Sequence, residues 1–355
     1  MTFERANIQS MQGYTPGEQL QGDVIKLNTN ENPYPPAPEV AKALSAIDAS
    51  ELRRYPPPLA SEFRTVAAQL HGVHEDNVIP TNGGDELLRL VLTTFVEPED
   101  TVLVGKPSYS LYPVLTDIQG CKLLEVPLLD DWTLSDQFFT ELASCKLCIL
   151  VNPHAPSGSL LPIETLRKVA QACAGILLID EAYVDFIDPA LNYNSLPMIA
   201  EFENVLMLRT LSKGYSLAGL RFGYGLGAAS LIAPMLYKTR DSYNTDLLSQ
   251  RLAYAALRAQ DYAQDNWAKV RQSRAALHEA LNTMGFSCIE SQSNFLLCTV
   301  PAGQNAQSLY EQLKARNILV RYFDQESLRD KLRISIGSDA EHEALLAATS
   351  ELLSS

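Results

Sequence analysis

The feature that most constrains this sequence is a lysine placed just after a strand-like apolar run. Residues 204–208, Asn-Val-Leu-Met-Leu, have the length and the flanking residues of a buried strand. Lys213 follows in the segment Arg-Thr-Leu-Ser-Lys-Gly-Tyr at residues 209–215. In open α/β sheets, ligands bind at the edge where strands end. The sequence therefore predicts a ligand site at a sheet edge, with an amine inside it.

The residues around Lys213 are suited to binding a phosphate group. Thr210 and Ser212 offer two hydroxyl donors, and Arg221 offers a planar fork of N–H groups. A lysine that forms Schiff bases beside a phosphate site is the signature of pyridoxal phosphate chemistry. An isolated Ser-Lys pair is more often an ordinary surface loop, so this prediction depends on other segments supplying the rest of the site.

Strand-like runs alternate with helical segments along the chain up to Lys213. We expect strands near residues 24–27, 77–80, 100–104, 121–126, 146–151, 176–179 and 205–208, with helices near residues 38–49, 59–70, 87–95, 163–173 and up to residue 119. This alternation predicts an α/β fold with a mainly parallel sheet covered by helices on both faces.

The chain is also expected to form more than one domain. Its 355 residues, 46% of them hydrophobic, exceed what a single core usually accommodates. We expect an N-terminal arm (residues 1–37) that packs on a small domain, and a large cofactor-binding domain (residues 38–245). A smaller α+β domain (residues 246–355) follows, with one long helix near residues 246–284 as the connector.

Composition excludes several classes of function. The net charge of −14 argues against nonspecific nucleic-acid binding and against docking on anionic membranes. No apolar run approaches the length of about 20 residues that a membrane span needs, and the N-terminus has no apolar signal core. Cys145 and Cys148 share a C-x-x-C spacing inside a strand-like run, so core cysteines are favoured over a metal or redox site. We expect a soluble, cytoplasmic protein without a metal.

Further polar residues fall where predicted strands end. Asp180 follows an apolar strand, and a buried carboxylate there needs a partner, such as the protonated pyridine nitrogen of the cofactor. Tyr183 and Asn152 can donate to the ring oxygen of the cofactor, and Tyr109 can stack on its ring. Each of these residues alone is more often a turn former or a core side chain, but together they favour a pyridoxal phosphate site.

A second phosphate-binding element precedes a predicted helix. Gly83, Gly84 and Asp85 open that helix directly after a strand. Free backbone N–H groups and the positive end of the helix dipole would both point at an anion there. A plain helix cap is an equally good interpretation of this segment on its own.

These motifs together resemble the fold-type I pyridoxal phosphate aminotransferases and, within them, the histidinol-phosphate aminotransferases. The resemblance covers nearly the whole chain, and its motifs lie at residues 27–34, 54–56, 82–86, 180–183, 209–213, 217–221, 293–295 and 332–337. One departure concerns residues 152–158, which read Asn-Pro-His-Ala-Pro-Ser-Gly where the family usually has Asn-Pro-Asn-Asn-Pro-Thr-Gly.

The resemblance implies roles that the residues alone do not. It implies a homodimer in which Tyr55 reaches the cofactor phosphate of the partner subunit. Arg333 is expected to pair with the substrate carboxylate, and Arg321 to lie near the substrate phosphate. Tyr14 and Asn32 are expected to join the substrate site. Lys213, assisted by Asp180 and Tyr183, would transfer a proton during exchange of an amino group between L-histidinol phosphate and 2-oxoglutarate, giving imidazole acetol phosphate and L-glutamate.

Other functions stay open on the sequence. An aromatic amino-acid aminotransferase or a phosphothreonine-type decarboxylase would share this fold and lysine. A cofactor-binding transcription regulator would need an added basic DNA-binding domain. A dinucleotide dehydrogenase is the weakest alternative, because Ala228 and Ala229 break the glycine pattern that begins at Gly223.

Overall fold

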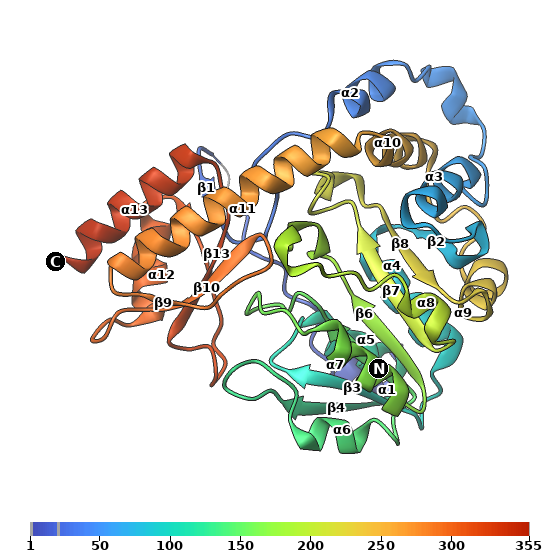
Figure 1. Cartoon of the computed structure of the whole chain (residues 1–355), viewed down its shortest axis with the longest axis horizontal. Helices are drawn as coiled ribbons and strands as arrows, with labels where there is room; N and C mark the ends of the chain where they lie inside the picture. The colour runs from blue at the N-terminus through green and yellow to red at the C-terminus, as the bar shows by residue number, and fades with distance from the viewer. Residues whose placement is uncertain (1–2, 20–21, 355) are drawn as a thin grey trace.

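The computed structural model describes residues 3–19 and 22–354, and a seven-stranded sheet forms the centre of its larger part (Figure 1). The strand order is β2-β8-β7-β6-β5-β3-β4. The strands are β2 (Val78–Thr81), β3 (Thr101–Lys106), β4 (Lys122–Pro127), β5 (Leu147–Val151), β6 (Ile176–Asp180), β7 (Val205–Thr210) and β8 (Gly223–Gly227). Strands β3 to β7 pair in parallel, whereas β8 runs antiparallel to β2 and β7. The prediction of a mainly parallel sheet is confirmed.

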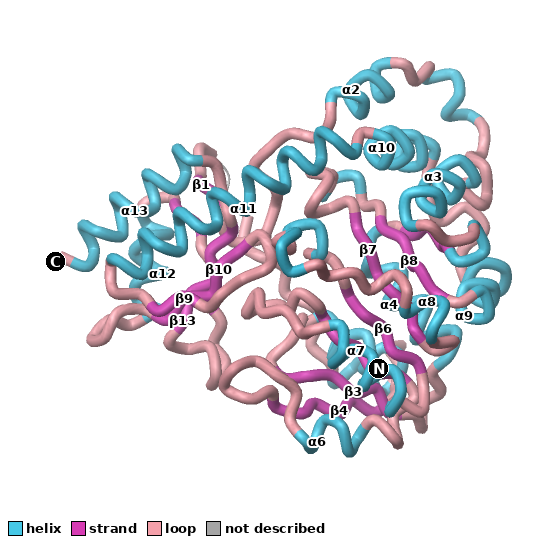
Figure 2. The backbone as a smooth tube through the Cα atoms, in the orientation of Figure 1, coloured by secondary structure: helices cyan, strands magenta, loops and turns pink. Residues whose placement is uncertain are grey.

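Helices cover both faces of this sheet (Figure 2). One face packs against α2 (Pro38–Ser45), α3 (Ser61–His71), α6 (Asp136–Glu141), α7 (Ile163–Ala172), α8 (Met198–Glu201) and α10 (Leu247–Arg258), and the other against α4 (Gly83–Phe95), α5 (Leu111–Gln119) and α9 (Ala229–Pro234). Leu177 and Leu178 of β6 belong to opposite cores. Burial on both faces explains why these strands are continuously apolar in sequence.

A four-stranded antiparallel sheet forms a second layer with its own core. Its strands, in the order β12-β13-β10-β9, are β9 (Ser287–Cys288), β10 (Phe295–Thr299), β12 (Arg321–Tyr322) and β13 (Lys331–Ser335). The third core joins this sheet to α11 (Gln260–Thr283), α12 (Ala306–Ala315) and α13 (Asp339–Leu353). Helix α11 runs from the end of α10 to this sheet (Figure 1). The domain boundaries given above remain a proposal.

The N-terminal segment contacts this C-terminal part. Strand β1 (Ile25–Lys26) pairs in parallel with β11 (Ile318–Leu319), and the short helix α1 (Ala6–Ser10) lies before it in the chain. This pairing brings residues that are far apart in sequence to one side of the central sheet.

Three local features differ from the sequence prediction or were missed by it. The single helix expected over residues 246–284 is divided at Ala259, whose φ of −95° and ψ of 50° lie outside the helical range. Strand β8 was not predicted, because its sequence has glycine at every second position, whereas strands are typically rich in β-branched and aromatic residues. The sequence also suggests strand material around residues 293–295, but Ser293 and Asn294 form a loop and β10 begins only at Phe295.

The cysteines fall into two groups. Four cysteines are free: Cys145, Cys148 and Cys173 are buried, as core cysteines are, and Cys121 is partly buried. Cys288 and Cys298 face each other across β9 and β10 and form a disulfide, which the expectation of a cytoplasmic, and so reducing, location did not anticipate. Within residues 3–19 and 22–354, no helix has both the length and the apolar character needed to span a membrane.

Candidate active site

A cavity of about 540 Å³ lies where the carboxyl edge of the central sheet meets the N-terminal segment and the four-stranded sheet. This volume is in the range typical of small-molecule sites. The predicted site residues that line it are Tyr14, Gly84, Asp85, Tyr109, Asp180, Tyr183, Thr210, Ser212, Lys213, Arg221, Arg321 and Arg333. Residues from both ends of the chain thus meet in one cavity.

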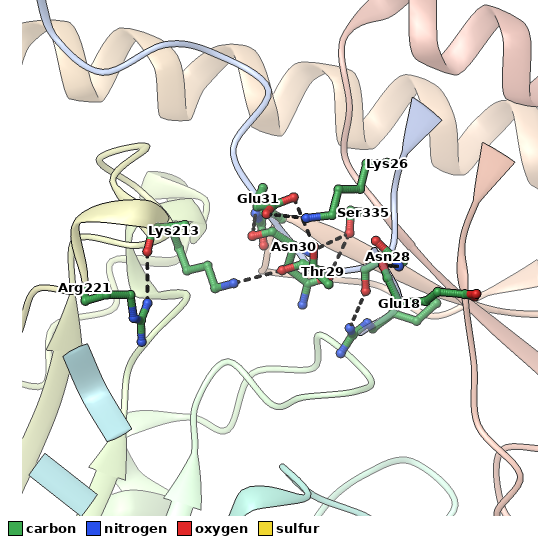
Figure 3. A network of polar contacts seen from close by, with 12 residues as sticks. Glu18, Lys26, Asn28, Thr29, Asn30, Glu31, Lys213, Arg221 and Ser335 are labelled. Atoms are coloured by element: carbon green, nitrogen blue, oxygen red, sulfur yellow. Dashed lines mark hydrogen bonds and ion pairs between the residues drawn. The ribbon is translucent and has the colours of Figure 1, made fainter. Parts of the chain in front are cut away.

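Lys213 extends from the loop after β7 across the cavity. Its Nζ donates to the backbone oxygen of Thr29 at 3.0 Å (Figure 3). Burial and the nearby Arg333 guanidinium lower the pKa of Lys213 to about 8. About a tenth of this amine is therefore neutral, and so nucleophilic, at pH 7, far more than for an ordinary lysine with a pKa of about 10.4.

Asp180 is the last residue of β6, and its carboxylate is buried. It accepts hydrogen bonds from the Tyr112 hydroxyl at 2.8 Å and from the Ala182 N–H at 3.1 Å. Burial nevertheless raises the pKa of Asp180 to about 6. A cationic group placed beside it would stabilise the carboxylate. Tyr112 was missed in the sequence because it lies inside helix α5 rather than at a strand end.

The two predicted phosphate-binding elements meet beside this cavity. Helix α4 begins at Gly83, which has a φ of +74° that favours glycine, so Gly84 and Asp85 occupy its first turn. The Arg221 guanidinium lies 3.5 Å from Ser212 Oγ and donates to the Ala218 carbonyl at 3.0 Å. Helix N–H groups, a hydroxyl and a guanidinium therefore converge on one corner.

Aromatic side chains form another part of the wall. The Tyr109 ring makes edge contacts with the rings of Tyr14 and Tyr112, with centroids 5.8 and 5.5 Å apart. The Tyr183 ring packs edge-on against Phe295 at 5.1 Å. Burial raises the pKa of both Tyr109 and Tyr183, so each hydroxyl keeps its proton near neutral pH.

Two arginines of the four-stranded sheet face the same cavity. Arg333 donates to the Asn28 carbonyl at 3.1 Å, but its Nε is buried without a hydrogen-bond partner among the described residues. A buried donor without a partner destabilises the folded protein, so a ligand that brings an acceptor to this nitrogen would bind favourably. Arg321 lies over the Phe323 ring at 5.3 Å. The pair suits a substrate with two anionic groups.

Four predicted site residues do not line the cavity: Gly83, Asn152, Asn32 and Tyr55. The Asn152 amide is buried and bonds to both backbone polar groups of Leu161 and to the Tyr193 hydroxyl. Ala155, from the same loop, faces the cavity instead. The Asn152 contact with the cofactor thus stays a prediction that this geometry does not support.

The other three residues have different roles or positions in the structure. Asn32 donates to the carbonyl oxygens of Lys213 and Gly214, at 3.1 and 3.3 Å, so it holds the lysine loop rather than a ligand. Gly83 supplies the turn before Gly84. The Tyr55 side chain is 80% exposed and stacks on the Tyr243 ring at 4.4 Å.

Comparison with known proteins identifies the family. Residues 22–348 match the family model described as aminotransferase class I and II. The chain belongs to the class I and II aminotransferases. This aminotransferase is 44% identical to histidinol-phosphate aminotransferase 1 of a Nostoc species, over 99% of each chain. It is 41% identical to histidinol-phosphate aminotransferase of Microcystis aeruginosa, over 98% of this chain and 97% of that one.

Solved structures agree with this assignment. The crystal structure of histidinol-phosphate aminotransferase from Sinorhizobium meliloti in complex with pyridoxal-5'-phosphate superposes with a TM-score of 0.91 at 26% identity. The superposition covers 99% of this aminotransferase and 98% of that chain. The resemblance seen in the motifs, the fold class and the assignment as an enzyme are confirmed.

Proposed function

We propose that this aminotransferase binds pyridoxal phosphate in its cavity and transfers an amino group from L-histidinol phosphate to 2-oxoglutarate. The products would be imidazole acetol phosphate and L-glutamate, as in histidine biosynthesis. The observation that carries the proposal is one cavity holding the Lys213 amine, the buried Asp180 carboxylate and two arginines. The names of the full-length relatives support the same substrate.

The donor set fits the cofactor. Asp180 would pair with the protonated ring nitrogen, and this cation would stabilise the carboxylate that burial disfavours. Tyr183 would donate to the ring oxygen, and Tyr109 would cover the ring face. The phosphate would be held by the N-terminus of α4, with Gly84 and Asp85 in its first turn, and by Thr210, Ser212 and Arg221. When bound, the cofactor supplies an electron sink for the bonds at the substrate Cα.

The protein's own residues would perform the proton chemistry and the positioning. Lys213 Nζ would remove the proton from the substrate Cα, acting as a general base with a pKa near the working pH. Arg333 Nε would donate a hydrogen bond to the substrate carboxylate, which would be its missing acceptor. Arg321, with Tyr14, would bind the substrate phosphate on the outer side of the cavity.

We also propose a cytoplasmic homodimer with the organisation in arm, large domain and small domain given above. Tyr55 supports this proposal because it lies outside the cavity of its own chain, with its side chain largely exposed. In a dimer, its hydroxyl would contribute to the phosphate site of the partner subunit. A small-molecule enzyme of this kind needs no nucleic acid or membrane partner.

The decisive experiment compares substrates on the yellow, cofactor-loaded protein and on its Arg321→Ala variant. We expect histidinol phosphate to bleach the visible absorption of the wild type at low concentration. Loss of a charge-assisted contact worth roughly 1.5–3 kcal/mol should weaken the binding of histidinol phosphate about 10- to 150-fold in the variant, and that of glutamate much less. Arg316→Ala removes an exposed arginine outside the cavity and serves as the matched control.

Three outcomes would redirect the assignment. Bleaching by phenylalanine but not by histidinol phosphate would indicate an aromatic amino-acid aminotransferase. Carbon dioxide release from phosphothreonine would indicate a decarboxylase. Equal losses for histidinol phosphate and glutamate in Arg321→Ala would remove Arg321 from the phosphate site.

A further inference from the structure

Asn30 lies in the cavity wall, and both polar groups of its backbone are hydrogen-bonded to neighbouring side chains. It is buried and has a φ of +56°, in the left-handed region that asparagine tolerates better than most residues. Its backbone N–H donates to Ser335 Oγ at 2.9 Å (Figure 3). Its backbone oxygen accepts from the Asn294 amide at 2.9 Å. The N-terminal segment is thereby tied to one end of the β10–β13 pair, where Phe295 at the start of β10 pairs with Ser335 at the end of β13.

These contacts also orient the Asn30 side chain. Ser335 Oγ accepts from the Asn30 N–H, so its single hydroxyl hydrogen is free to donate to Asn30 Oδ1 at 2.9 Å. With Oδ1 occupied as the acceptor, the amide nitrogen of Asn30 faces the other way and donates to the Tyr183 hydroxyl oxygen at 3.0 Å.

The direction of that last hydrogen bond determines what Tyr183 can do. A tyrosine hydroxyl has one hydrogen and can accept as well as donate. Because Asn30 donates to the oxygen, the hydrogen of Tyr183 cannot point back at Asn30. No described residue is hydrogen-bonded as its acceptor. The Tyr183 side chain lines the cavity and its ring is held by Phe295, so its hydrogen remains available to a ligand.

We propose that Asn30 is a positioning residue that sets Tyr183 as a hydrogen-bond donor toward the cofactor's ring oxygen. This inference rests on the proposed function, since it assigns no ligand beyond pyridoxal phosphate. Asn30 also lines the cavity, but its side-chain amide is bonded to the Tyr183 hydroxyl and to Ser335, so it acts through Tyr183 and is not among the residues proposed above to touch the cofactor. The titratable groups that act on Tyr183 are Arg333, Asp180 and Tyr14, with Lys213 Nζ 5.9 Å from its ring centre.

The substitution Asn30→Asp tests the direction of this bond. Aspartate has nearly the same size and also tolerates a positive φ, but its carboxylate has only acceptors. The Tyr183 hydroxyl would then donate to residue 30, and the ring oxygen would lose its donor. The proton on the Lys213 nitrogen that is bonded to the cofactor partly neutralises the negative charge of the ring oxygen. When that proton is lost, the ring oxygen depends most on the hydrogen bond from Tyr183. Losing the donor should therefore raise the pKa of that nitrogen.

The measurement is a spectrophotometric pH titration of the visible absorption in the cofactor-loaded protein. We expect Asn30→Asp to raise the apparent pKa by about 1 unit, a tenfold change in proton affinity. The new carboxylate could raise this pKa by its charge alone, so the same substitution is made in a Tyr183→Phe background. If Asn30 acts through Tyr183, the shift should largely disappear there.

A second variant protects the test against misfolding. Asn30→Gly adopts a φ of +56° freely and removes the amide without adding charge, so it should give a smaller shift in the same direction. An unchanged pKa in both variants, or an equal shift in the Tyr183→Phe background, would overturn the role of Asn30. Absence of any visible complex between the wild-type protein and pyridoxal phosphate would instead overturn the proposed function.

Discussion

At the scale of single residues, the cavity holds two groups whose charged states are disfavoured by burial. Burial and Arg333 lower the pKa of Lys213 to about 8, and burial raises the pKa of Asp180 to about 6. The neutral form of the lysine is therefore more populated and reactive, and a cationic partner would stabilise the charged form of the carboxylate. One ligand that offers an aldehyde and a ring nitrogen would satisfy both groups.

The pKa of Lys213 predicts how attachment of the cofactor depends on pH. The protonated amine cannot attack, so the rate should rise as pH increases through about 8 and level off above it. The measurement is the growth of visible absorption when cofactor-free protein is mixed with pyridoxal phosphate between pH 6 and 10. The Lys213→Ala variant should give no such band and no turnover. A midpoint near that of an ordinary lysine would show that the amine is not perturbed.

The sequence predicted some of these residues and missed others for physical reasons. Lys213 and Asp180 were predictable because each lies at or just beyond the end of an apolar strand, and parallel strands bring their carboxyl ends to one edge. Asn30 and Tyr112 carry no such signal, since their partners are distant in sequence. Asn152 follows a strand as well, but the course of its loop turns the side chain toward Leu161.

At the scale of elements, strand β8 determines how closely α4 approaches the sheet. A Cβ added at Gly225 would lie 2.9–3.0 Å from side-chain atoms of Ile79 and Leu87. A Cβ at Gly223 would lie 2.8 Å from the Gly83 carbonyl carbon and 2.9 Å from the Gly84 nitrogen. These last contacts are with backbone atoms, which cannot move aside easily. The start of α4 can therefore approach β8 this closely only because residue 223 has no side chain.

Gly223→Ala should therefore weaken the phosphate site. The added methyl must push the first turn of α4 away, and overpacking of this kind costs about 1–3 kcal/mol. We expect the dissociation constant for pyridoxal phosphate to rise about tenfold, because 1.4 kcal/mol corresponds to a factor of ten. Equilibrium binding and thermal unfolding measure the effect. Gly219→Ala is the matched control, since a Cβ there meets nothing within 4 Å; similar losses in both variants would contradict this account.

The elements that were predicted correctly are those with strong local patterns. The apolar runs of β3, β5, β6 and β7 reflect burial on both faces, which the sequence shows directly. Strand β8 has glycine at alternate positions because tertiary packing requires it, and that requirement is not visible locally. The break at Ala259 has no glycine or proline to mark it.

At the scale of the whole molecule, the exposed stack of Tyr55 on Tyr243 leads to a test of shared sites. In the proposed dimer, a site combines Lys213 of one chain with Tyr55 of the other. Co-expressed Lys213→Ala and Tyr55→Ala chains should then regain up to about a quarter of the wild-type activity, because half of randomly paired dimers hold one intact site of two. The measurement is activity of the mixed dimer against each parent. If no activity is recovered, Tyr55 does not contribute to the active site of the partner subunit.

The pairing of β1 with β11, and of Asn30 with Ser335, has a consequence for synthesis on the ribosome. The N-terminal segment is made first, while the strands that hold it are among the last to emerge. Because domains tend to fold as they leave the ribosome, the central sheet with Lys213 can form while this segment still lacks its partners. A chain released before residue 318 would carry the reactive lysine but lack the opposite wall of its own site.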